Sequence, residues 1–180
     1  PSGQSMLIDT GFPGFNDRDT TRILEACEAA GVKKLDILVT THYDLDHVGN
    51  TPSLLSRISA SMFVDHGPPV DQNPRSLATV KAYEELANKG RRVTAKPGGK
   101  IPFGDVDVLV VMSATEPLKT PVKGGGAANP ACAGVERMTW PRGNEDNSEN
   151  GNSVGLLFTY GRFRMLDLGD LTWNRELELM

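Results

Sequence analysis

The sequence is poor in cysteine, histidine and aromatic residues: its 180 positions hold two Cys and three His, and Phe, Trp and Tyr together make up 6%. Cys27 and Cys132 are too few for a disulfide scaffold and too far apart for a CxxC zinc or redox motif. No apolar run approaches the roughly 18 residues that a membrane-spanning helix requires. We therefore expect a globular chain without a membrane segment, in which neither thiol is a strong candidate nucleophile.

Positive charge is also scarce. The 19 Lys and Arg residues are outnumbered by 23 Asp and Glu, which gives a formal net charge of -4 at pH 7. A chain without a basic surface lacks the electrostatic footprint with which proteins hold a long stretch of nucleic-acid backbone. We expect a small-molecule substrate and no extended nucleic-acid surface.

The spacing of apolar residues predicts strands and helices in alternation along the chain. Strands are expected at 5–9, 35–39, 61–64, 106–112, 153–160 and 163–168, and helices at 19–30, from 51, at 74–88 and from 173. Alternation of this kind favours an α/β architecture, in which helices pack on the faces of a sheet. The length suits one domain, so residues 1–180 are expected to form a single unit.

One stretch, at about 113–150, interrupts this alternation. It contains Gly124-Gly125-Gly126, four prolines and a polar run that begins at Gly143. Long loops in compact domains are uncommon and are often binding elements or mobile lids. A solvated insertion without a role is the alternative, and the sequence does not decide between the two.

Ligand-competent side chains are concentrated just after the second predicted strand. His42, Asp44, Asp46 and His47 lie within six residues, and two of the three histidines of the chain are among them. Carboxylates this close repel one another and are costly to bury, so a cation that neutralises them is the simplest reason to assemble them. The mixture of imidazole and carboxylate suits Zn²⁺, Mn²⁺ or Fe²⁺. A solvated polar turn is the alternative interpretation.

This segment resembles the HxHxDH metal motif of the metallo-β-lactamase superfamily, with Asp44 where the second His usually stands. A similar HxDxDH variant occurs in hydrolase domains of bacterial DNA-uptake channel proteins. Residues 7–11, LIDTG, resemble the first motif of the superfamily, in which the Asp, here Asp9, orients the metal loop. Residues 168–170, LGD, resemble the fourth motif, whose Asp, here Asp170, bridges two metals.

The resemblance implies a four-layer αββα sandwich of the metallo-β-lactamase type, incomplete at the C-terminus. It implies one or two divalent metal ions, zinc before manganese or iron. His42 and Asp44 would belong to the first ion and Asp46 and His47 to the second, and Asp170 would lie between them. The metal ligands expected on this basis are therefore His42, Asp44, Asp46, His47 and Asp170.

Two further parts of the superfamily pattern are missing from the sequence. The third motif should supply a His, but the corresponding stretch, 150–153, reads NGNS. The His of the fifth motif would lie beyond Met180, so we expect the intact protein to continue for another half-domain. The remaining histidine, His66, ends another predicted strand. It is a candidate ligand, a support for a ligand or a substrate contact, and a structural His without a role is the alternative.

These features predict a metal-dependent hydrolase that uses a metal-activated water, with Asp46 as the catalytic residue that orients the water. No GxSxG elbow and no glycine-rich phosphate loop is present, which disfavours a serine hydrolase or a nucleotide-dependent enzyme. The motif variant favours phosphoester-like substrates, and lactones are also expected candidates. A β-lactam-hydrolysing enzyme and a non-catalytic or degenerate metal-binding module are the alternatives.

Overall fold

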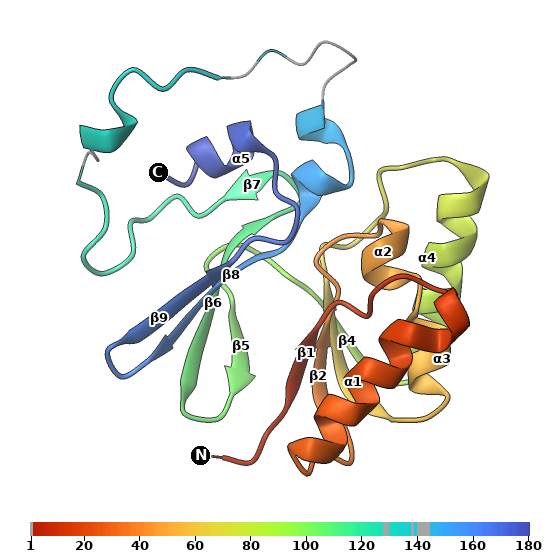
Figure 1. Cartoon of the computed structure of the whole chain (residues 1–180). Coiled ribbons are helices and arrows are strands. Elements are labelled where there is room, and N and C mark those ends of the chain that lie inside the picture. Colours follow the sequence, from red (N-terminus) through yellow and green to blue (C-terminus); the bar gives the residue numbers. More distant parts are fainter. Residues whose placement is uncertain (1, 128–129, 138, 140–144) are drawn as a thin grey trace.

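Two β-sheets face each other, and helices cover the outer face of the first sheet (Figure 1). The structure is a computed structural model that describes residues 2–127, 130–137, 139 and 145–180. In these residues, no helix has the length and the apolar character needed to cross a membrane. The helix, sheet and sheet layers of the expected αββα sandwich are thus present.

Sheet A is parallel throughout, with its strands in the order of the chain. Its strands are β1 (Met6–Ile8), β2 (Leu35–Val39), β3 (Ala60–Asp65) and β4 (Arg91–Thr94). The connections between them contain α1 (Arg18–Ala29), α2 (Leu45–Val48), α3 (Thr51–Leu55) and α4 (Pro74–Ala87). Because all four strands run in one direction, their C-terminal ends meet at one edge of the sheet, where loops tend to form sites.

The sequence specifies the ends of several helices. Gly31, just after α1, has a φ of +69°, a conformation in which a glycine commonly ends a helix. Pro52 lies in the first turn of α3, where its missing N–H costs nothing. Asn73 caps α4, because its side chain accepts a hydrogen bond from the backbone N–H of Arg75.

Sheet B is antiparallel. Its strands are β5 (Lys100–Phe103), β6 (Val106–Ser113), β8 (Gly155–Tyr160) and β9 (Phe163–Asp167), in the order β5-β6-β8-β9, with β7 (Glu116–Pro117) beside the end of β6. The helix α5 (Trp173–Leu177) follows. Residues of the 118–126 segment and the last residues after α5 line a cavity with the outward side chains Val111, Leu157 and Leu166. The outer face of sheet B therefore carries this segment and the end of the chain instead of a layer of long helices.

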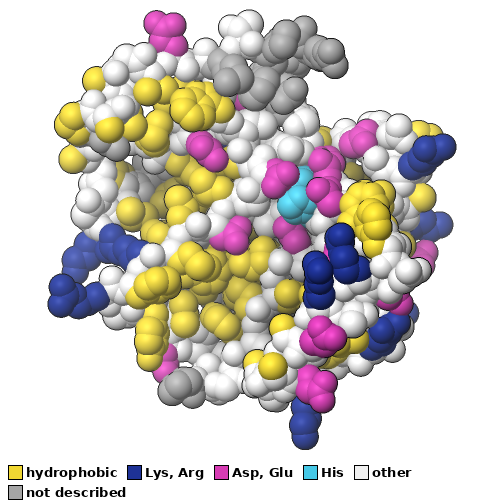
Figure 2. All heavy atoms as spheres, in the orientation of Figure 1, with side chains coloured by type: hydrophobic (Ala, Val, Ile, Leu, Met, Phe, Trp, Pro, Cys, Tyr) yellow, Lys and Arg dark blue, Asp and Glu magenta, His cyan; other side chains and the backbone are white. Residues whose placement is uncertain are grey.

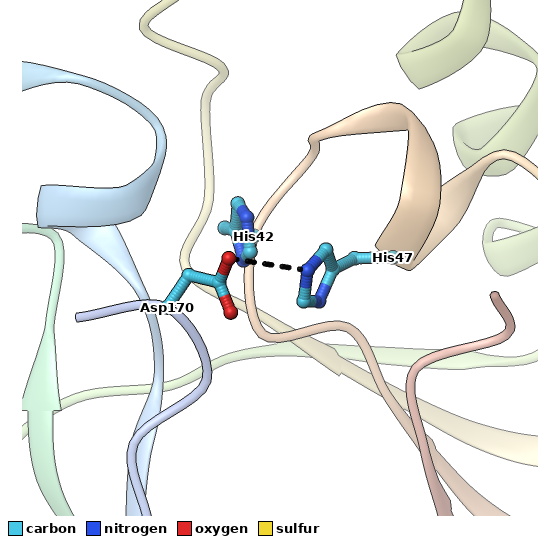
Figure 3. A group of neighbouring side chains, drawn as sticks. All are labelled: His42, His47 and Asp170. Atoms are coloured by element: carbon cyan, nitrogen blue, oxygen red, sulfur yellow. Dashed lines mark ion pairs between the residues drawn. The ribbon is translucent and has the colours of Figure 1, made fainter. Parts of the chain in front are cut away.

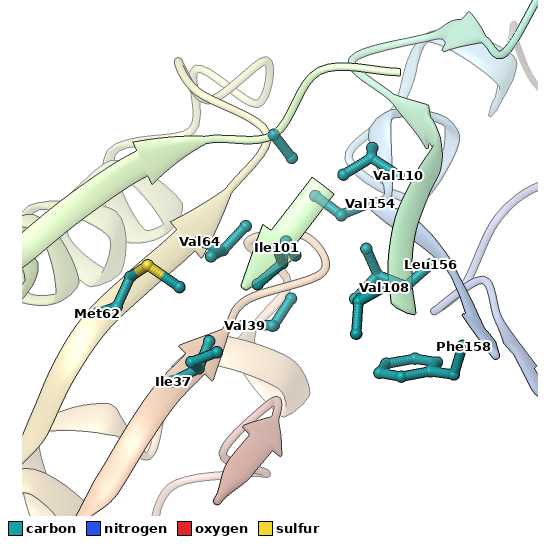
Figure 4. Packing of buried hydrophobic residues seen from close by; sticks show 11 residues of the cluster. Ile37, Val39, Met62, Val64, Ile101, Val108, Val110, Val154, Leu156 and Phe158 are labelled. Atoms are coloured by element: carbon teal, nitrogen blue, oxygen red, sulfur yellow. The ribbon is translucent and has the colours of Figure 1, made fainter. Parts of the chain in front are cut away.

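The main hydrophobic core lies between the two sheets (Figure 4). Its members are Ile37, Val39, Met62 and Val64 from sheet A, Ala95 just beyond it, Ile101, Val108, Val110, Leu156 and Phe158 from sheet B, and Val154 next to β8. Successive side chains of a strand point to opposite faces, so Leu38 of β2 packs instead with Phe63, Val80 and Tyr83 beneath α4. Burial on both faces explains why β2 ends in three consecutive apolar residues, Ile37, Leu38 and Val39.

Parts of the stretch at about 113–150, which interrupts the predicted alternation, form strands and short helices. Residues 128–129, 138 and 140–144 of it lie outside the described part of the chain. Ser113 still belongs to β6, and β7 pairs with the end of that strand. Short 3-10 helices occur at Glu145–Asn147 and Asn150–Asn152. The prediction also missed β4 and β5, whose short segments carry no clear alternation of apolar residues.

Candidate metal centre

The His/Asp segment lies at the C-terminal edge of sheet A. It follows β2 directly, and Asp46 and His47 lie in the single turn of α2. Behind it, the backbone O of Thr41 accepts a hydrogen bond of 2.8 Å from the N–H of Val154, just before β8. The segment is therefore held between the two sheets at the edge where parallel strands end.

His42 is fully buried, with only one of its ring nitrogens engaged. Its Nδ1 lies 3.0 Å from Oγ1 of Thr41. Its Nε2 has no hydrogen-bond partner among the described residues and lies 3.6 Å from Oδ2 of Asp44. A buried polar atom without a partner costs free energy, and coordination of a cation by this nitrogen would remove that cost.

His47 is oriented by Asp9. Its Nδ1 lies 2.7 Å from Oδ2 of Asp9, whose oxygens also accept hydrogen bonds from the N–H and Oγ1 of Thr41 at 2.8 and 2.7 Å. Asp9 has a φ of +58°, an uncommon conformation that Asp tolerates better than most residues. The carboxylate of Asp9 therefore holds both Thr41, which supports His42, and the ring of His47, whose Nε2 is left to face Asp46 and Asp170.

Asp170 completes a group of three. One ligand atom from each of His42, His47 and Asp170 lies within 4.8 Å of the other two, and Figure 3 shows the three side chains pointing toward one another. Oδ2 of Asp170 is 3.6 Å from Nε2 of His47. Asp170 is brought there by Gly169, which packs so closely on Thr41 that an added Cβ would lie 2.8 Å from the Cβ of Thr41.

The other two expected ligands lie beside this group without joining it. Asp46 has an Oδ2 atom 3.8 Å from Nε2 of His47, and its side chain is 61% exposed. Asp44 is 45% exposed and lies next to His42. Each carboxylate is thus adjacent to the histidine with which the sequence motif pairs it.

The charges around His47 act on its protonation. Burial lowers the pKa of this imidazole, but the hydrogen bond to Asp9 and the charges of Asp9, Asp170 and Asp46 outweigh burial and raise the pKa above its ordinary value. In Figure 2, a histidine on this face is surrounded by acidic side chains. Excess negative charge of this kind is what a divalent cation would neutralise.

The donor set fits a metal ion. His42 and His47 both use Nδ1 within the protein, so both offer Nε2, and Asp170 offers a carboxylate oxygen. Ligating histidines usually donate their other N–H to a carboxylate, hydroxyl or carbonyl in this way. Imidazole with carboxylate is a set that zinc, manganese and iron accept.

His66 lies outside this group. Its Nε2 is 3.0 Å from Oε2 of Glu149, and its ring packs on Tyr43 with centroids 4.5 Å apart. Glu149 also accepts hydrogen bonds from the backbone N–H groups of Val70 and Asp71, and its Oε2 is 3.4 Å from the backbone N of Tyr43. Sequence reasoning missed Glu149, because no local pattern marks a partner that lies 83 residues away.

The stretch that stands in place of the third motif also lies near Thr41. The side chain of Asn152 donates a hydrogen bond of 2.7 Å to the backbone O of Ser148 and is therefore turned to its own loop. Ser153 is fully buried, and its Oγ has no partner in the part of the chain that the structure describes. No described histidine, cysteine or acid from this stretch joins the group of three.

Several solved metallo-beta-lactamase structures are similar to this chain. A Thermotoga maritima chain named as a candidate metallo-beta-lactamase is 16% identical, with a TM-score of 0.49, over 92% of this chain and 62% of that one. A Cronobacter sakazakii metallo-beta-lactamase with a HARLDQ motif is 14% identical, with a TM-score of 0.49, over 94% and 54%. The subclass B3 enzyme BJP-1 of Bradyrhizobium japonicum is 18% identical, with a TM-score of 0.46, over 92% and 52%.

This chain thus spans less than two thirds of the length of these proteins. Comparison with curated protein sequences gives no match. A sequence model described as the metallo-beta-lactamase superfamily matches residues 1–130, which include the first motif and the whole His/Asp segment. The chain therefore belongs to the metallo-beta-lactamase superfamily.

Proposed function

We propose that this protein is a metal-dependent hydrolase whose metal ligands are His42, His47 and Asp170, with Asp44 and Asp46 contributing beside them. The observation that carries the proposal is the convergence of one ligand atom from each of His42, His47 and Asp170 within 4.8 Å. Membership of the superfamily supports metal-dependent hydrolysis in general. The identity and number of the ions, zinc first, belong to the proposal.

A bound divalent ion would supply Lewis acidity and lower the pKa of a water toward neutrality. The residues around it have separate tasks. Asp9 holds His47 through Nδ1, so the ring needs no reorganisation to present Nε2. Thr41 does the same for His42. Asp46, largely exposed and adjacent to His47, is placed to orient a water and to accept its proton.

The proposed substrates are small phosphoesters, with lactones as the second choice. The site holds more carboxylates than imidazoles, and a set rich in oxygen favours harder cations, which pair well with phosphoryl oxygen. Two described histidines are available at the centre, and the position of the third motif supplies none. This donor set is the reason for placing phosphoesters before β-lactams.

The test is metal content by elemental analysis of the purified chain after incubation with zinc, manganese or iron salts. Wild type should hold about one or two equivalents, and the double variant His42→Ala/His47→Ala should hold none. The variant His66→Ala is the matched control, because this histidine lies outside the group of three. A wild type that takes up no metal, or equal losses in both variants, would overturn the proposed centre.

Assays of substrate turnover distinguish the proposed hydrolase from the alternative functions. Bis-p-nitrophenyl phosphate, a chromogenic lactone and a chromogenic cephalosporin should be assayed on the metal-loaded chain. Hydrolysis of the phosphodiester that is lost in Asp46→Asn supports the proposal. Hydrolysis of the cephalosporin alone would favour a β-lactam-hydrolysing enzyme, and metal uptake without any turnover would favour a non-catalytic metal-binding module.

A further inference from the structure

A second cavity, of about 570 Å³, opens at the ends of β3, β4 and β6. Its walls come from three segments: His66 after β3, residues 94–98 at the end of β4 and beyond it, and residues 113–114 and 116–120 around β7. The volume is in the range of small-molecule sites in proteins. None of the three residues that converge in the metal centre lines it.

Two residues that line this cavity each hold a buried polar atom without a partner among the described residues. Nδ1 of His66 and Oγ of Ser113 have no hydrogen-bond partner among the described residues, and the two residues are 2% and 1% exposed. Leaving such groups unpaired costs free energy, so a ligand that pairs them is favoured. Two such atoms in residues that line the same cavity point to a binding site.

The tautomer of His66 defines what its free nitrogen can bind. Its Nε2 faces Glu149, where burial raises the pKa of the carboxyl but the hydrogen bonds that Glu149 receives outweigh burial and lower it. A carboxylate only accepts hydrogen bonds, so Nε2 of His66 carries a proton toward Glu149 and Nδ1 is the ring nitrogen left for a ligand. A hydroxyl both donates and accepts hydrogen bonds, so it is a ligand group that matches this nitrogen.

The rim of the cavity adds positive charge. Lys96 and Lys119 both line it. Lys119 is paired with Glu116 at 3.8 Å, whereas Lys96 has no ion-pair partner among the residues that the structure describes. Both lysines are exposed while His66 and Ser113 are buried, so an anionic group would lie outward and hydroxyls inward.

We propose that this cavity binds a small sugar phosphate, with hydroxyls on His66 Nδ1 and Ser113 Oγ and the phosphate beside Lys96. A strained turn holds the wall in place: Ala114 and Thr115 have φ values of +49° and +66°, which is unusual for residues other than glycine and especially so for a β-branched one. The N–H of Ala114 is fixed by a hydrogen bond of 3.1 Å to the backbone O of Asn152.

The test is isothermal titration calorimetry of the full 180-residue chain with ribose 5-phosphate, ribose and inorganic phosphate. Ribose 5-phosphate should bind more tightly than either of its parts. Ser113→Ala should weaken binding about fivefold, the effect of one hydrogen bond, and Lys96→Gln should weaken it about twofold or more. The matched controls are Ser56→Ala and Lys33→Gln, which change residues away from this cavity.

The variant Asp170→Asn tests whether the ligand binds in this cavity or at the metal centre, and it does so without relying on the proposed hydrolase activity. It should leave the affinity for ribose 5-phosphate unchanged, because Asp170 does not line this cavity. Loss of binding in Asp170→Asn with none in Ser113→Ala would place the ligand on the metal centre and overturn the proposal. Absence of saturable binding, or equal losses in Ser113→Ala and Ser56→Ala, would also overturn it. Lys96 is exposed, so Lys96→Gln tests the proposal even if Ser113→Ala does not fold.

Discussion

Asp9 and His47 are joined by a hydrogen bond of 2.7 Å between residues 38 positions apart, and this contact ties the end of β1 to the metal loop. The same carboxylate accepts hydrogen bonds from the N–H and hydroxyl of Thr41, whose hydroxyl lies 3.0 Å from His42. Both candidate histidine ligands are therefore held, directly or through Thr41, by one residue outside the group of three.

Replacing Asp9 should weaken metal binding. In Asp9→Asn the amide nitrogen would take the place of the oxygen that His47 needs, while Asn tolerates the positive φ. We expect zinc affinity to fall by about 10–100-fold, measured by competition with a chromogenic chelator. Asp36→Asn is the control, because the carboxylate of Asp36 also accepts a hydrogen bond from a backbone N–H, that of Ser5, away from the metal group. Equal affinities in the two variants would contradict this role for Asp9.

Gly169 and Gly161 form a matched pair of glycines with φ values of +54° and +57°. An added Cβ at Gly169 would lie 2.8 Å from the Cβ of Thr41, whereas at Gly161 it would meet nothing within 4 Å. Gly161→Ala should cost only the roughly 1–2 kcal/mol of the left-handed conformation. Gly169→Ala should cost more and also reduce zinc affinity by displacing Asp170. Urea unfolding and zinc titration measure both effects, and equal behaviour would refute the packing argument.

Arg92 neutralises a carboxylate that is completely buried. Its Nε is 2.7 Å from Oδ2 of Asp65. Burial lowers the pKa of Arg92, but the hydrogen bond and charge of Asp65 outweigh burial and raise it. Arg92→Ala should reduce the free energy of unfolding by about 3 kcal/mol, because it leaves a buried charge uncompensated. Lys100→Ala breaks the exposed pair with Asp107 and should cost less than about 1 kcal/mol.

Urea unfolding at neutral pH measures both variants. The double variant Arg92→Ala/Asp65→Asn should recover part of the loss, because the buried group no longer carries a charge. No recovery would show that Arg92 stabilises the fold through packing instead of charge. Such packing is available, because its guanidinium lies 5.7 Å from the ring centroid of Tyr83.

Glu149 should make stability depend on pH in the acid range. Burial raises the pKa of Glu149, but the hydrogen bonds from His66, Asp71 and Val70 outweigh burial and lower it. A carboxyl whose pKa is lower in the folded than in the unfolded state stabilises above the unfolded value, about 4.3, and this stabilisation is lost as the pH falls through the folded value. Glu149→Gln should therefore unfold with a flatter dependence on pH below about 5 than wild type. Parallel curves would contradict this assignment.

The sequence alone determined most of the secondary structure and the ligand types. The bounds expected for β2 agree with the structure, and those of α4 agree to within one residue, because apolar spacing and capping signals are local. β4 was not predicted, because its pattern is half exposed and only pairing with β3 makes it a strand. Local patterns do not record such a partner.

The candidate site was also predicted only in part from the sequence. His42, Asp44, Asp46 and His47 are close in sequence, so their density revealed them, and the resemblance to the superfamily added Asp9 and Asp170. Only the tertiary structure decided that His66 pairs with Glu149 instead of joining the metal group, and that Ser113 lines a cavity without a hydrogen-bond partner for its hydroxyl among the described residues. These relationships arise where the strand ends of two sheets meet, and that meeting depends on how the sheets pack across their shared core.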